Sequence, residues 1–351
     1  MRTDALDYDL PDSAIAQRPA EPRDAARLLV ALGDTIQHRT VADLPALVGP
    51  GDVVVVNDTR VIPARVPVVR STGGRGEVLL LDEAGEGWWE ALLRPARKLH
   101  DGDVLTAQRS ASSSAALRFE VGSDLGEGRR LVRPVHEGEL LDALDEAGEM
   151  PLPPYLSGEG LDDPDRYQTV YADRPGSAAA PTAGLHFTPE LLAAVAATGA
   201  VLAHVELAVG LGTFRPITVE RVEDHEMHRE RYRVPPETWD AVQRAERVVA
   251  VGTTTVRALE SAAASGELSG ATTLFITPSY RWQVVDVLLT NFHLPRSSLL
   301  AMVEAFVGPR WRDLYATALR EGYRFLSFGD AMLLERAPTD PPVPPTVEAR
   351  S

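Results

Sequence analysis

The stretch Val248-Val-Ala-Val-Gly-Thr-Thr-Thr-Val-Arg257 predicts a strand that runs directly into a helix. The apolar run stops at Gly252, and three threonines open the helix. Glycine lets a ligand approach the backbone closely, and the first turn of a helix presents unpaired N–H groups and the positive end of its dipole. This turn therefore suits an anionic or polar ligand, although the turn alone names no chemistry.

Helix and strand patterns alternate on both sides of this turn. Thr188 is a good N-cap, with Pro189 at the first helical position and Gly199 beyond the end, and Val53–Val56 is typical of a buried strand. The further elements expected are strands at 201–209, 248–251 and 282–289 and helices at 237–246, 256–264 and 295–306. Such alternation predicts a mostly parallel, barrel-like α/β main domain.

Residues 61–150 have a different pattern, with short apolar stretches separated by glycine-rich turns. This pattern favours a small antiparallel β-barrel or sandwich. We expect it to be inserted into an α/β catalytic domain made of residues 1–60 and 151–336. The serine-rich run 110–116 is expected to be a loop, and the Pro-rich end, 337–351, a disordered tail.

The amino-acid composition excludes several kinds of chemistry. The 351-residue chain has no cysteine, so disulfides, thiol nucleophiles and cysteine-ligated metals are excluded. The formal net charge is −16, and Lys98 is the lone lysine among 35 basic residues. No run approaches the roughly 20 apolar residues of a membrane helix and the N-terminus lacks a secretion signal, so we expect a cytoplasmic protein that does not contact membranes.

Five of the eight histidines lie in one region, which favours proton transfer, since imidazole exchanges protons near neutral pH. They are His186, His204, His225, His228 and His293. A surface or hydrogen-bonded core position is the alternative for each. His225 and His228 could share a helical face as metal ligands, but no third ligand follows at a recognisable spacing, so we expect no metal.

Three strand patterns end in polar residues, and ligands of parallel α/β proteins bind at the carboxyl ends of strands. The candidates for one pocket are Asn57, Asp58, Thr59 and Arg60; Gly252, Thr253, Thr254 and Arg257; and Asn291 with His293. The amide side chains of Asn57 and Asn291 could hydrogen-bond the edge of a nucleobase, and Asp58 could bind a ribose hydroxyl or an amine. The arginines could bind a phosphate or a carboxylate. A local salt bridge is the alternative for Asp58 and Arg60. Thr182 lies in a run of small residues, 176–184, that suits close ligand approach, a lid or a plain loop.

With these motifs in order, the chain resembles the S-adenosylmethionine:tRNA ribosyltransferase-isomerase family of queuosine biosynthesis. The resemblance covers nearly the whole sequence. The matching stretches are Tyr8-Asp-Leu-Pro, Asn57-Asp-Thr-Arg-Val-Ile-Pro-Ala-Arg65, Pro151-Leu-Pro-Pro-Tyr, Arg166-Tyr-Gln-Thr-Val-Tyr-Ala172, Ala180-Pro-Thr-Ala-Gly-Leu-His-Phe-Thr188, Gly212-Thr-Phe214, His225-Glu-Met-His228, Val251-Gly-Thr-Thr-Thr-Val-Arg257, Leu289-Thr-Asn-Phe-His-Leu-Pro295 and Tyr323-Arg-Phe with Gly329-Asp-Ala-Met332.

The resemblance implies transfer and isomerisation of the ribosyl part of S-adenosylmethionine onto 7-aminomethyl-7-deazaguanine at the wobble position of tRNA. Epoxyqueuosine in tRNA, adenine and methionine are the products. S-adenosylmethionine is then a consumed co-substrate, no cofactor or metal is needed, and the enzyme works alone or as a weak homo-oligomer. His186 or His293 would transfer a proton, and Asn57 and Asp58 would bind a nucleoside. The Gly252 turn and Arg257 would bind a methionine carboxylate or a tRNA phosphate.

An acidic tRNA enzyme must concentrate its arginines, and the groove we expect holds Arg60, Arg65, Arg94 and Arg97. Two positions depart from the family's pattern, Ala208 where histidine is common and Ser279 where glycine is common. The alternatives are an S-adenosylmethionine-dependent transferase acting on a small nucleoside and a noncatalytic nucleotide- or RNA-binding module.

Overall fold

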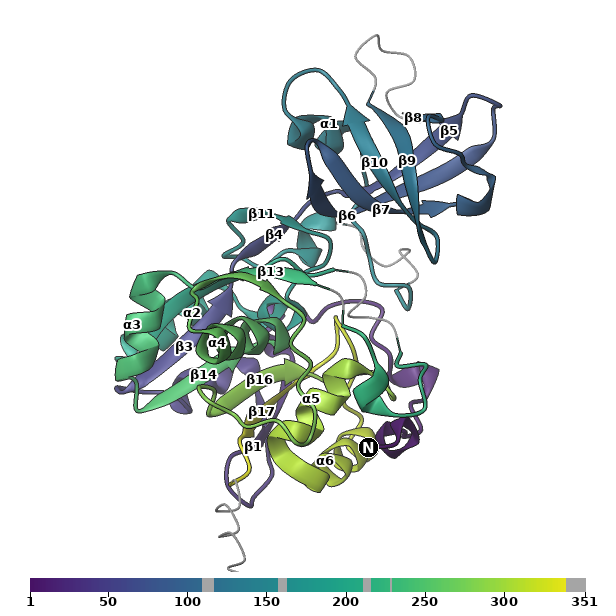
Figure 1. Cartoon of the computed structure of the whole chain (residues 1–351). Helices are drawn as coiled ribbons and strands as arrows, with labels where there is room; N and C mark the ends of the chain where they lie inside the picture. Colours follow the sequence, from purple (N-terminus) through teal and green to yellow (C-terminus); the bar gives the residue numbers. More distant parts are fainter. Residues whose placement is uncertain (109–116, 157–162, 211–215, 228, 339–351) are drawn as a thin grey trace, which may run out of the picture.

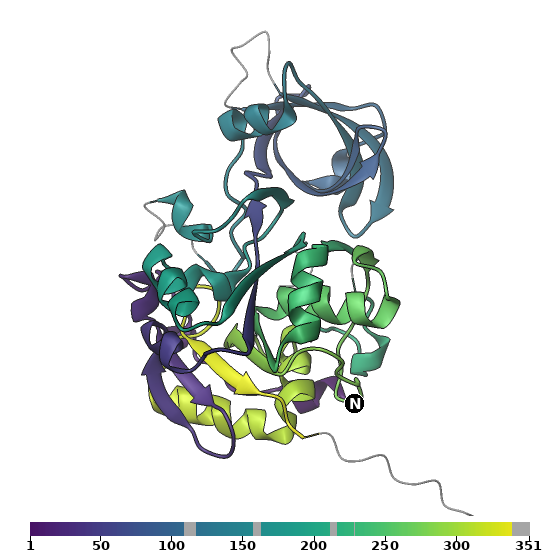
Figure 2. The same ribbon diagram turned by 90° about the vertical axis from the view of Figure 1, so that its left-hand side faces the viewer.

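The computed structural model describes residues 1–108, 117–156, 163–210, 216–227 and 229–338. Within them the chain forms a large sheet with helices on both faces and a closed β-barrel (Figure 1). The barrel lies at one end of the molecule in both views (Figure 2). The expected α/β main domain with an inserted small antiparallel barrel is confirmed.

Nine strands form the main sheet. They are β1 (Arg27–Ala31), β2 (Gln37–Thr40), β3 (Asp52–Asn57), β12 (Val201–Leu207), β13 (Glu230–Arg233), β14 (Arg247–Val251), β15 (Ser269–Thr272), β16 (Val287–Asn291) and β17 (Ala331–Glu335). Their order is β15-β13-β12-β3-β14-β16-β17-β1-β2. β12, β3, β14 and β16 run parallel to one another, as do β17 and β1, and the other pairings are antiparallel. The sheet is thus open and more mixed than the sequence pattern predicted, because β17 reverses direction beside β16 and short strands join both edges.

The centre of this sheet explains its two-sided core. All residues of β3 are buried. Val53 and Val55 pack into the hydrophobic cluster on one face, and Val54 and Val56 into the cluster on the other. Successive side chains of a strand point to opposite faces, so a continuous valine run is stable only where both faces are covered.

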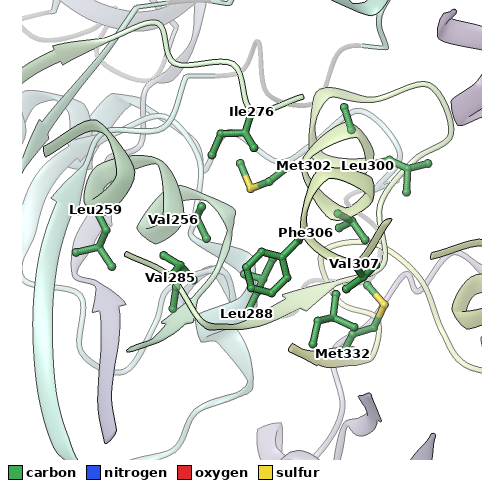
Figure 3. Close-up of a cluster of buried hydrophobic side chains, with 14 of the residues drawn as sticks. Val256, Leu259, Ile276, Val285, Leu288, Leu300, Met302, Phe306, Val307 and Met332 are labelled. Carbon is green, nitrogen blue, oxygen red and sulfur yellow. The ribbon is translucent and has the colours of Figure 1, made fainter. Parts of the chain in front are cut away.

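The described residues form six α-helices around the main sheet and the barrel. They are α1 (Leu140–Ala147), α2 (Pro189–Ala197), α3 (Pro236–Arg244), α4 (Thr253–Ser265), α5 (Ser298–Val307) and α6 (Trp311–Arg320). α3, α4, α5 and α6 contribute to the cluster on one face of the main sheet, and α2 to the cluster on the other. Figure 3 shows part of the first cluster, in which Val256 of α4 and Phe306 of α5 join Leu288 of β16.

Most elements around the Gly252 turn begin and end near the predicted residues. Thr188 caps α2 by accepting a hydrogen bond from the Leu191 N–H at 3.0 Å, and Pro189 is its first residue. The strand predicted over 282–289 is wrong in its first half. Residues 283–285 instead form a loop whose backbone N–H groups all donate to the buried carboxylate of Glu260, and β16 starts at Val287.

The barrel strands are β5 (Arg65–Arg70), β6 (Arg75–Gly85), β7 (Trp88–Arg94), β8 (Val104–Ala107), β9 (Arg118–Gly126) and β10 (Arg129–Val135). They close in the order β10-β7-β6-β5-β8-β9 around an apolar core, to which α1 adds Leu144 and Ala147. Arg65 and Glu149 exchange backbone hydrogen bonds of 3.3 and 2.7 Å, so the chain enters and leaves this unit at one point. The serine-rich run 110–116 and residues 339–351 of the expected tail lie outside the described residues.

A third, two-stranded sheet connects these units. β4 (Thr59–Val61) continues from the end of β3 and pairs in parallel with β11 (Arg174–Ser177). Figure 1 shows β4 and β11 between the main sheet and the barrel. The residues after β3 are thereby fixed at the edge of the main sheet that faces the barrel.

Candidate active site

The carboxyl ends of the neighbouring parallel strands β14 and β16 line a pocket, and no residue of β3 or of the polar segment after it is among the lining residues. A short helical turn, η7 (Thr182–His186), closes one side of it. The pocket is open to solvent on one side, and about 350 Å³ of space free of protein atoms, open solvent included, lies within it. Its lining is Ala180, Pro181, Thr182, Ala183, Val209, Gly252, Thr253, Thr254, Thr290, Asn291, His293 and Leu299.

The Gly252 turn lies in this pocket and has the geometry that only glycine adopts readily. Its φ is +92° and its ψ is 151°. A Cβ there would meet nothing closer than the Ala183 Cβ at 3.6 Å, so conformation and not crowding selects glycine. No side chain caps the first turn of α4, and both Thr253 and Thr254 line the pocket. The first-turn N–H groups are therefore available to an anionic group.

Asn57 lies directly behind this turn. Its Nδ2 donates to the Leu207 carbonyl at 3.0 Å and to Thr254 Oγ1 at 3.1 Å. Its Oδ1 accepts from the Leu207 N–H at 3.2 Å and from the N–H and hydroxyl of Thr59 at 3.2 and 2.5 Å. Protein groups thus occupy the donors and acceptor of the Asn57 amide and connect β3, β12 and α4. Asn57 could bind a nucleoside only if these hydrogen bonds rearranged.

Asn291 organises the opposite wall. Its Oδ1 accepts from the Thr182 hydroxyl at 2.9 Å, and its Nδ2 lies 3.2 Å from His186 Nε2 and 3.2 Å from the Leu326 carbonyl. His186 is 4 % exposed and lines neither this pocket nor the one that adjoins it. Burial, with Arg324 and Arg23 nearby, lowers the pKa of His186 to about 4. His186 therefore supports Asn291 from behind as a neutral imidazole.

His293 lines the pocket itself. Its Nε2 lies 2.9 Å from Thr290 Oγ1, and no described residue hydrogen-bonds its Nδ1. Two tyrosines hold its backbone, since the Tyr315 hydroxyl accepts from the N–H at 3.0 Å and the Tyr8 hydroxyl donates to the carbonyl at 2.5 Å. Burial lowers the pKa of His293 to about 3, so the ring is neutral near pH 7.

A second pocket, also open to solvent and with about 330 Å³ of space free of protein atoms, open solvent included, adjoins the first. Thr182, Asn291, His293 and Leu299 line both, so these side chains form a shared wall. The remaining lining residues are Tyr155, Phe292, Leu294, Ser297, Leu326 and Ser327. The Tyr155 hydroxyl and Ser327 Oγ lie 2.6 Å apart. The second pocket has two aromatic side chains, Tyr155 and Phe292, whereas the first has four threonines together with apolar residues.

Asp58 has a different environment from Asn57. Its Oδ2 lies 3.9 Å from His204 Nδ1, and its buried Oδ1 has no partner in the described residues. Burial raises the pKa of the Asp58 carboxyl, and the nearby His204 opposes this. Asp58 lines neither pocket, so its predicted contact with a ribose or an amine stays a prediction.

Arg257 lies one turn along α4 and is 3 % exposed. It forms an ion pair with Glu230, and its Nε donates to the Leu274 carbonyl at 3.1 Å. Glu230 also accepts from the Gly210 N–H at 3.1 Å. Burial lowers the pKa of Arg257 to about 10, and Nη2 has no partner in the described part of the chain. Arg257 thus ties α4 to β13 beside the pocket and does not line it.

The other predicted site residues lie outside the two pockets. Arg60 is exposed on β4, and His225 follows a short helical turn with its ring 5.5 Å from that of Phe275. His228 and the Gly212-Thr-Phe214 motif lie outside the described residues. Of the four arginines expected to form a groove, Arg65 is half-buried and 3.5 Å from Glu77, while Arg60, Arg94 and Arg97 are exposed.

Sequence reasoning missed three residues that matter in this arrangement. Tyr155 and Ser327 line the second pocket, and Glu230 holds Arg257. Tyr155 ends the Pro151-Leu-Pro-Pro-Tyr motif, which was the available signal for it. Ser327 and Glu230 belong to segments without a chemical pattern of their own, so only the fold brings them to the site.

The described residues have neither a metal-binding cluster nor a membrane-spanning helix. They contain no cluster of three or more His, Asp or Glu side chains arranged to hold a metal ion. Their helices also include none with the length and apolar character needed to cross a membrane.

An α/β sheet with a pocket at its strand ends and an inserted β-barrel defines a class of α/β proteins built from two units. Within that class, the chain belongs to the queuosine biosynthesis protein family, whose model matches residues 3–334.

Similar proteins extend over nearly the same length. An S-adenosylmethionine:tRNA ribosyltransferase-isomerase of Rubrobacter xylanophilus is 56% identical over 95% of this chain and 98% of its own. The protein of the same name from Thermus thermophilus is 50% identical over 94% of this chain and 99% of its own. Among solved structures, the S-adenosylmethionine tRNA ribosyltransferase of Thermotoga maritima aligns with a TM-score of 0.53 and 34% identity, covering 94% of this chain and 99% of that one.

Proposed function

We propose that this protein is an S-adenosylmethionine:tRNA ribosyltransferase-isomerase of queuosine biosynthesis. It transfers and isomerises the ribosyl part of S-adenosylmethionine onto 7-aminomethyl-7-deazaguanine in the wobble position of tRNA. The products are epoxyqueuosine-tRNA, adenine and methionine. The observation that carries the proposal is the 56% identity, over almost the full length of both chains, with a relative of that name.

The chemistry has three requirements: a base must remove a proton from the carbon beside the sulfonium, an acid must help adenine leave, and polar groups must steady the rearranging ribose. His293 suits the base, because it lines both pockets and no described residue hydrogen-bonds its Nδ1. Asn291 and Thr182 suit the ribose, because both line the wall beside His293. His186 then acts as a positioning residue through Asn291.

We further propose that the enzyme uses S-adenosylmethionine as a consumed co-substrate without a metal or other cofactor. It works in the cytoplasm as a monomer or a weak homo-oligomer, and its second substrate is tRNA carrying the aminomethyl-deazaguanine base.

The test incubates the purified full chain with S-adenosylmethionine and a tRNA anticodon stem-loop that carries this base, with EDTA present. Adenine release is followed by chromatography and the RNA by mass spectrometry. The proposal expects adenine together with a mass gain of one rearranged ribosyl unit. No adenine and no mass gain, beside an active relative as control, contradicts it. Turnover of a free nucleoside without RNA would favour a small-nucleoside transferase.

A further inference from the structure

The two pockets share a wall and differ in the residues beyond it. The first contains the Gly252 turn with Thr253 and Thr254, the second contains the aromatic rings of Tyr155 and Phe292, and apolar side chains line both. S-adenosylmethionine is similarly divided, with a charged amino-acid end, a flat adenine and a ribose with the sulfonium between them. A ligand of this kind can bind across both pockets in one of two directions, and the structure distinguishes them.

The two helices that begin at this site differ in their caps. Ser297 caps α5 by accepting from the Leu300 N–H at 3.2 Å, whereas no side chain caps α4. Free N–H groups and the positive dipole end favour an anion at α4 rather than at α5. A second observation agrees with this. The Thr253 side chain lines the first pocket on a residue only 7 % exposed, and its hydroxyl has no partner in the described residues.

The second pocket has the features of a site for an aromatic base. Tyr155, Phe292, Leu294 and Leu326 offer apolar and aromatic surface, and Ser327 with Ser297 offers a few hydroxyls. Leu326 has φ of +69°, an unfavourable backbone conformation for leucine, and Asn291 holds it there through the Leu326 carbonyl. Asn291, which is part of the wall shared by the two pockets, therefore also contacts the backbone of Leu326 on the apolar side of the second pocket.

We propose that S-adenosylmethionine binds with its carboxylate at the first turn of α4 and the Thr253 hydroxyl, and with its adenine beside Tyr155 in the second pocket. The ribose and sulfonium then lie at the shared wall, next to His293 Nδ1 and Asn291. This direction rests on the proposed function, and in it His293, which lines both pockets, lies beside the carbon that must lose a proton.

The experiment compares two non-reacting probes by calorimetry on the full chain. S-adenosylhomocysteine carries the amino-acid end, and 5′-methylthioadenosine lacks it. Thr253→Val, which removes only the hydroxyl, should weaken S-adenosylhomocysteine about tenfold and leave 5′-methylthioadenosine within about twofold, since a hydrogen bond to a charged group is lost for the first probe only. Tyr155→Leu should weaken both probes about tenfold.

Two variants are the controls for this comparison. Thr253→Ser keeps the hydroxyl and should bind both probes like the wild type. Thr317→Val, on α6 and away from both pockets, should change neither affinity. If Thr253→Val fails to fold, as judged by its unfolding transition, Thr253→Ala replaces it with the same expectation.

The direction is overturned if Thr253→Val weakens both probes equally or 5′-methylthioadenosine alone, or if Tyr155→Leu leaves both unchanged. The wild type is assayed for adenine release in parallel, so that the two proposals fail separately. Adenine release with a reversed binding pattern overturns the direction only. The expected pattern without adenine release overturns the ribosyl transfer and leaves the binding site standing.

Discussion

At the scale of single residues, burial separates the roles of two histidines that look equivalent in the sequence. Both are neutral and hydrogen-bonded to polar residues at the end of β16. Only His293 lines the pockets, with Nδ1 unpartnered in the described residues. The sequence indicated a proton-transfer histidine but could not choose between them, because the choice depends on which side of Asn291 each ring lies.

The first prediction concerns His293→Gln. Glutamine can still reach Thr290 as Nε2 does, but it places no basic nitrogen at the position of Nδ1. We expect kcat for adenine release to fall about 10²- to 10⁴-fold, the usual contribution of a general base, with S-adenosylhomocysteine affinity nearly unchanged. His186→Gln, measured in the same assay, should lose less. A larger loss for His186→Gln would reverse the two roles.

The second prediction concerns stability in acid. An unfolded histidine binds its proton near pH 6.5, whereas folding lowers the pKa of His186 to about 4 and that of His293 to about 3. Between about pH 6.5 and pH 4 the unfolded chain binds more protons, so the free energy of unfolding falls as the pH falls.

Urea unfolding across this range should therefore show a shallower pH dependence for His186→Gln than for the wild type. His100→Gln, which changes an exposed histidine, is the control and should keep the wild-type slope. Equal slopes for all three proteins would contradict the assignment of the acid effect to buried histidines.

At the scale of elements, the strand-to-helix turn after β14 could be predicted from the sequence. The hydrogen bonds by which Asn57 holds this turn could not. Gly252 and the following threonines are contiguous in sequence, so the turn and the open helix end follow from local rules. The hydrogen bonds of Asn57 connect β3 to β12 and α4, about 150 and 200 residues away. No local pattern specifies that partnership, so an amide predicted for a ligand is found bonded to the protein.

The third prediction tests the turn. Gly252→Ala forces alanine into a conformation that only glycine adopts easily, at a cost of about 1–3 kcal/mol in the free energy of unfolding. It should also reduce adenine release, because the backbone at the pocket must shift. Gly33→Ala, at a surface turn with open space around it, is the control and should retain activity. Full activity of Gly252→Ala would show that the turn does not touch substrate.

The fourth prediction tests Asn57. Asn57→Ala leaves several buried polar groups without partners, each costing about 1–3 kcal/mol, so we expect a loss of at least about 3 kcal/mol in urea unfolding. Gln37→Ala on the exposed strand β2 should change stability by less than about 0.5 kcal/mol. A stable Asn57→Ala protein that no longer binds S-adenosylhomocysteine would instead restore the predicted nucleoside contact.

At the scale of the whole molecule, the sequence predicted an α/β unit with an inserted barrel but not how the two are held together. Arg231 on β13 contacts Asp82 at 2.7 Å and Glu83 at 3.6 Å on β6. Because this contact joins two units through exposed side chains, no hydrophobic periodicity indicates it. The mixed sheet order was equally hidden, since β17 and the short edge strands resemble many other apolar or polar segments.

The fifth prediction concerns RNA binding by the barrel. Arg94 and Arg97 are exposed and pair with no acidic side chain in the described residues, unlike Arg65. If each meets one phosphate, Arg94→Ala or Arg97→Ala should weaken tRNA binding and reduce the slope of log Kd against log salt by about one. Arg320→Ala on α6, at the opposite end of the molecule in Figure 1, should leave the slope unchanged. An unchanged slope for both barrel variants would move the RNA interface elsewhere.

The paired backbones of Arg65 and Glu149 have a consequence for the history of this chain. Because the two ends of the barrel insertion are hydrogen-bonded to each other, the main domain sees it as it would see a hairpin turn. Loss or replacement of the barrel would therefore leave the register of the main-sheet strands unchanged. Evolution can therefore alter the barrel without disturbing the pocket at the strand ends. We expect the two parts to diverge at different rates among related genes, with chemistry held fixed while RNA contacts vary.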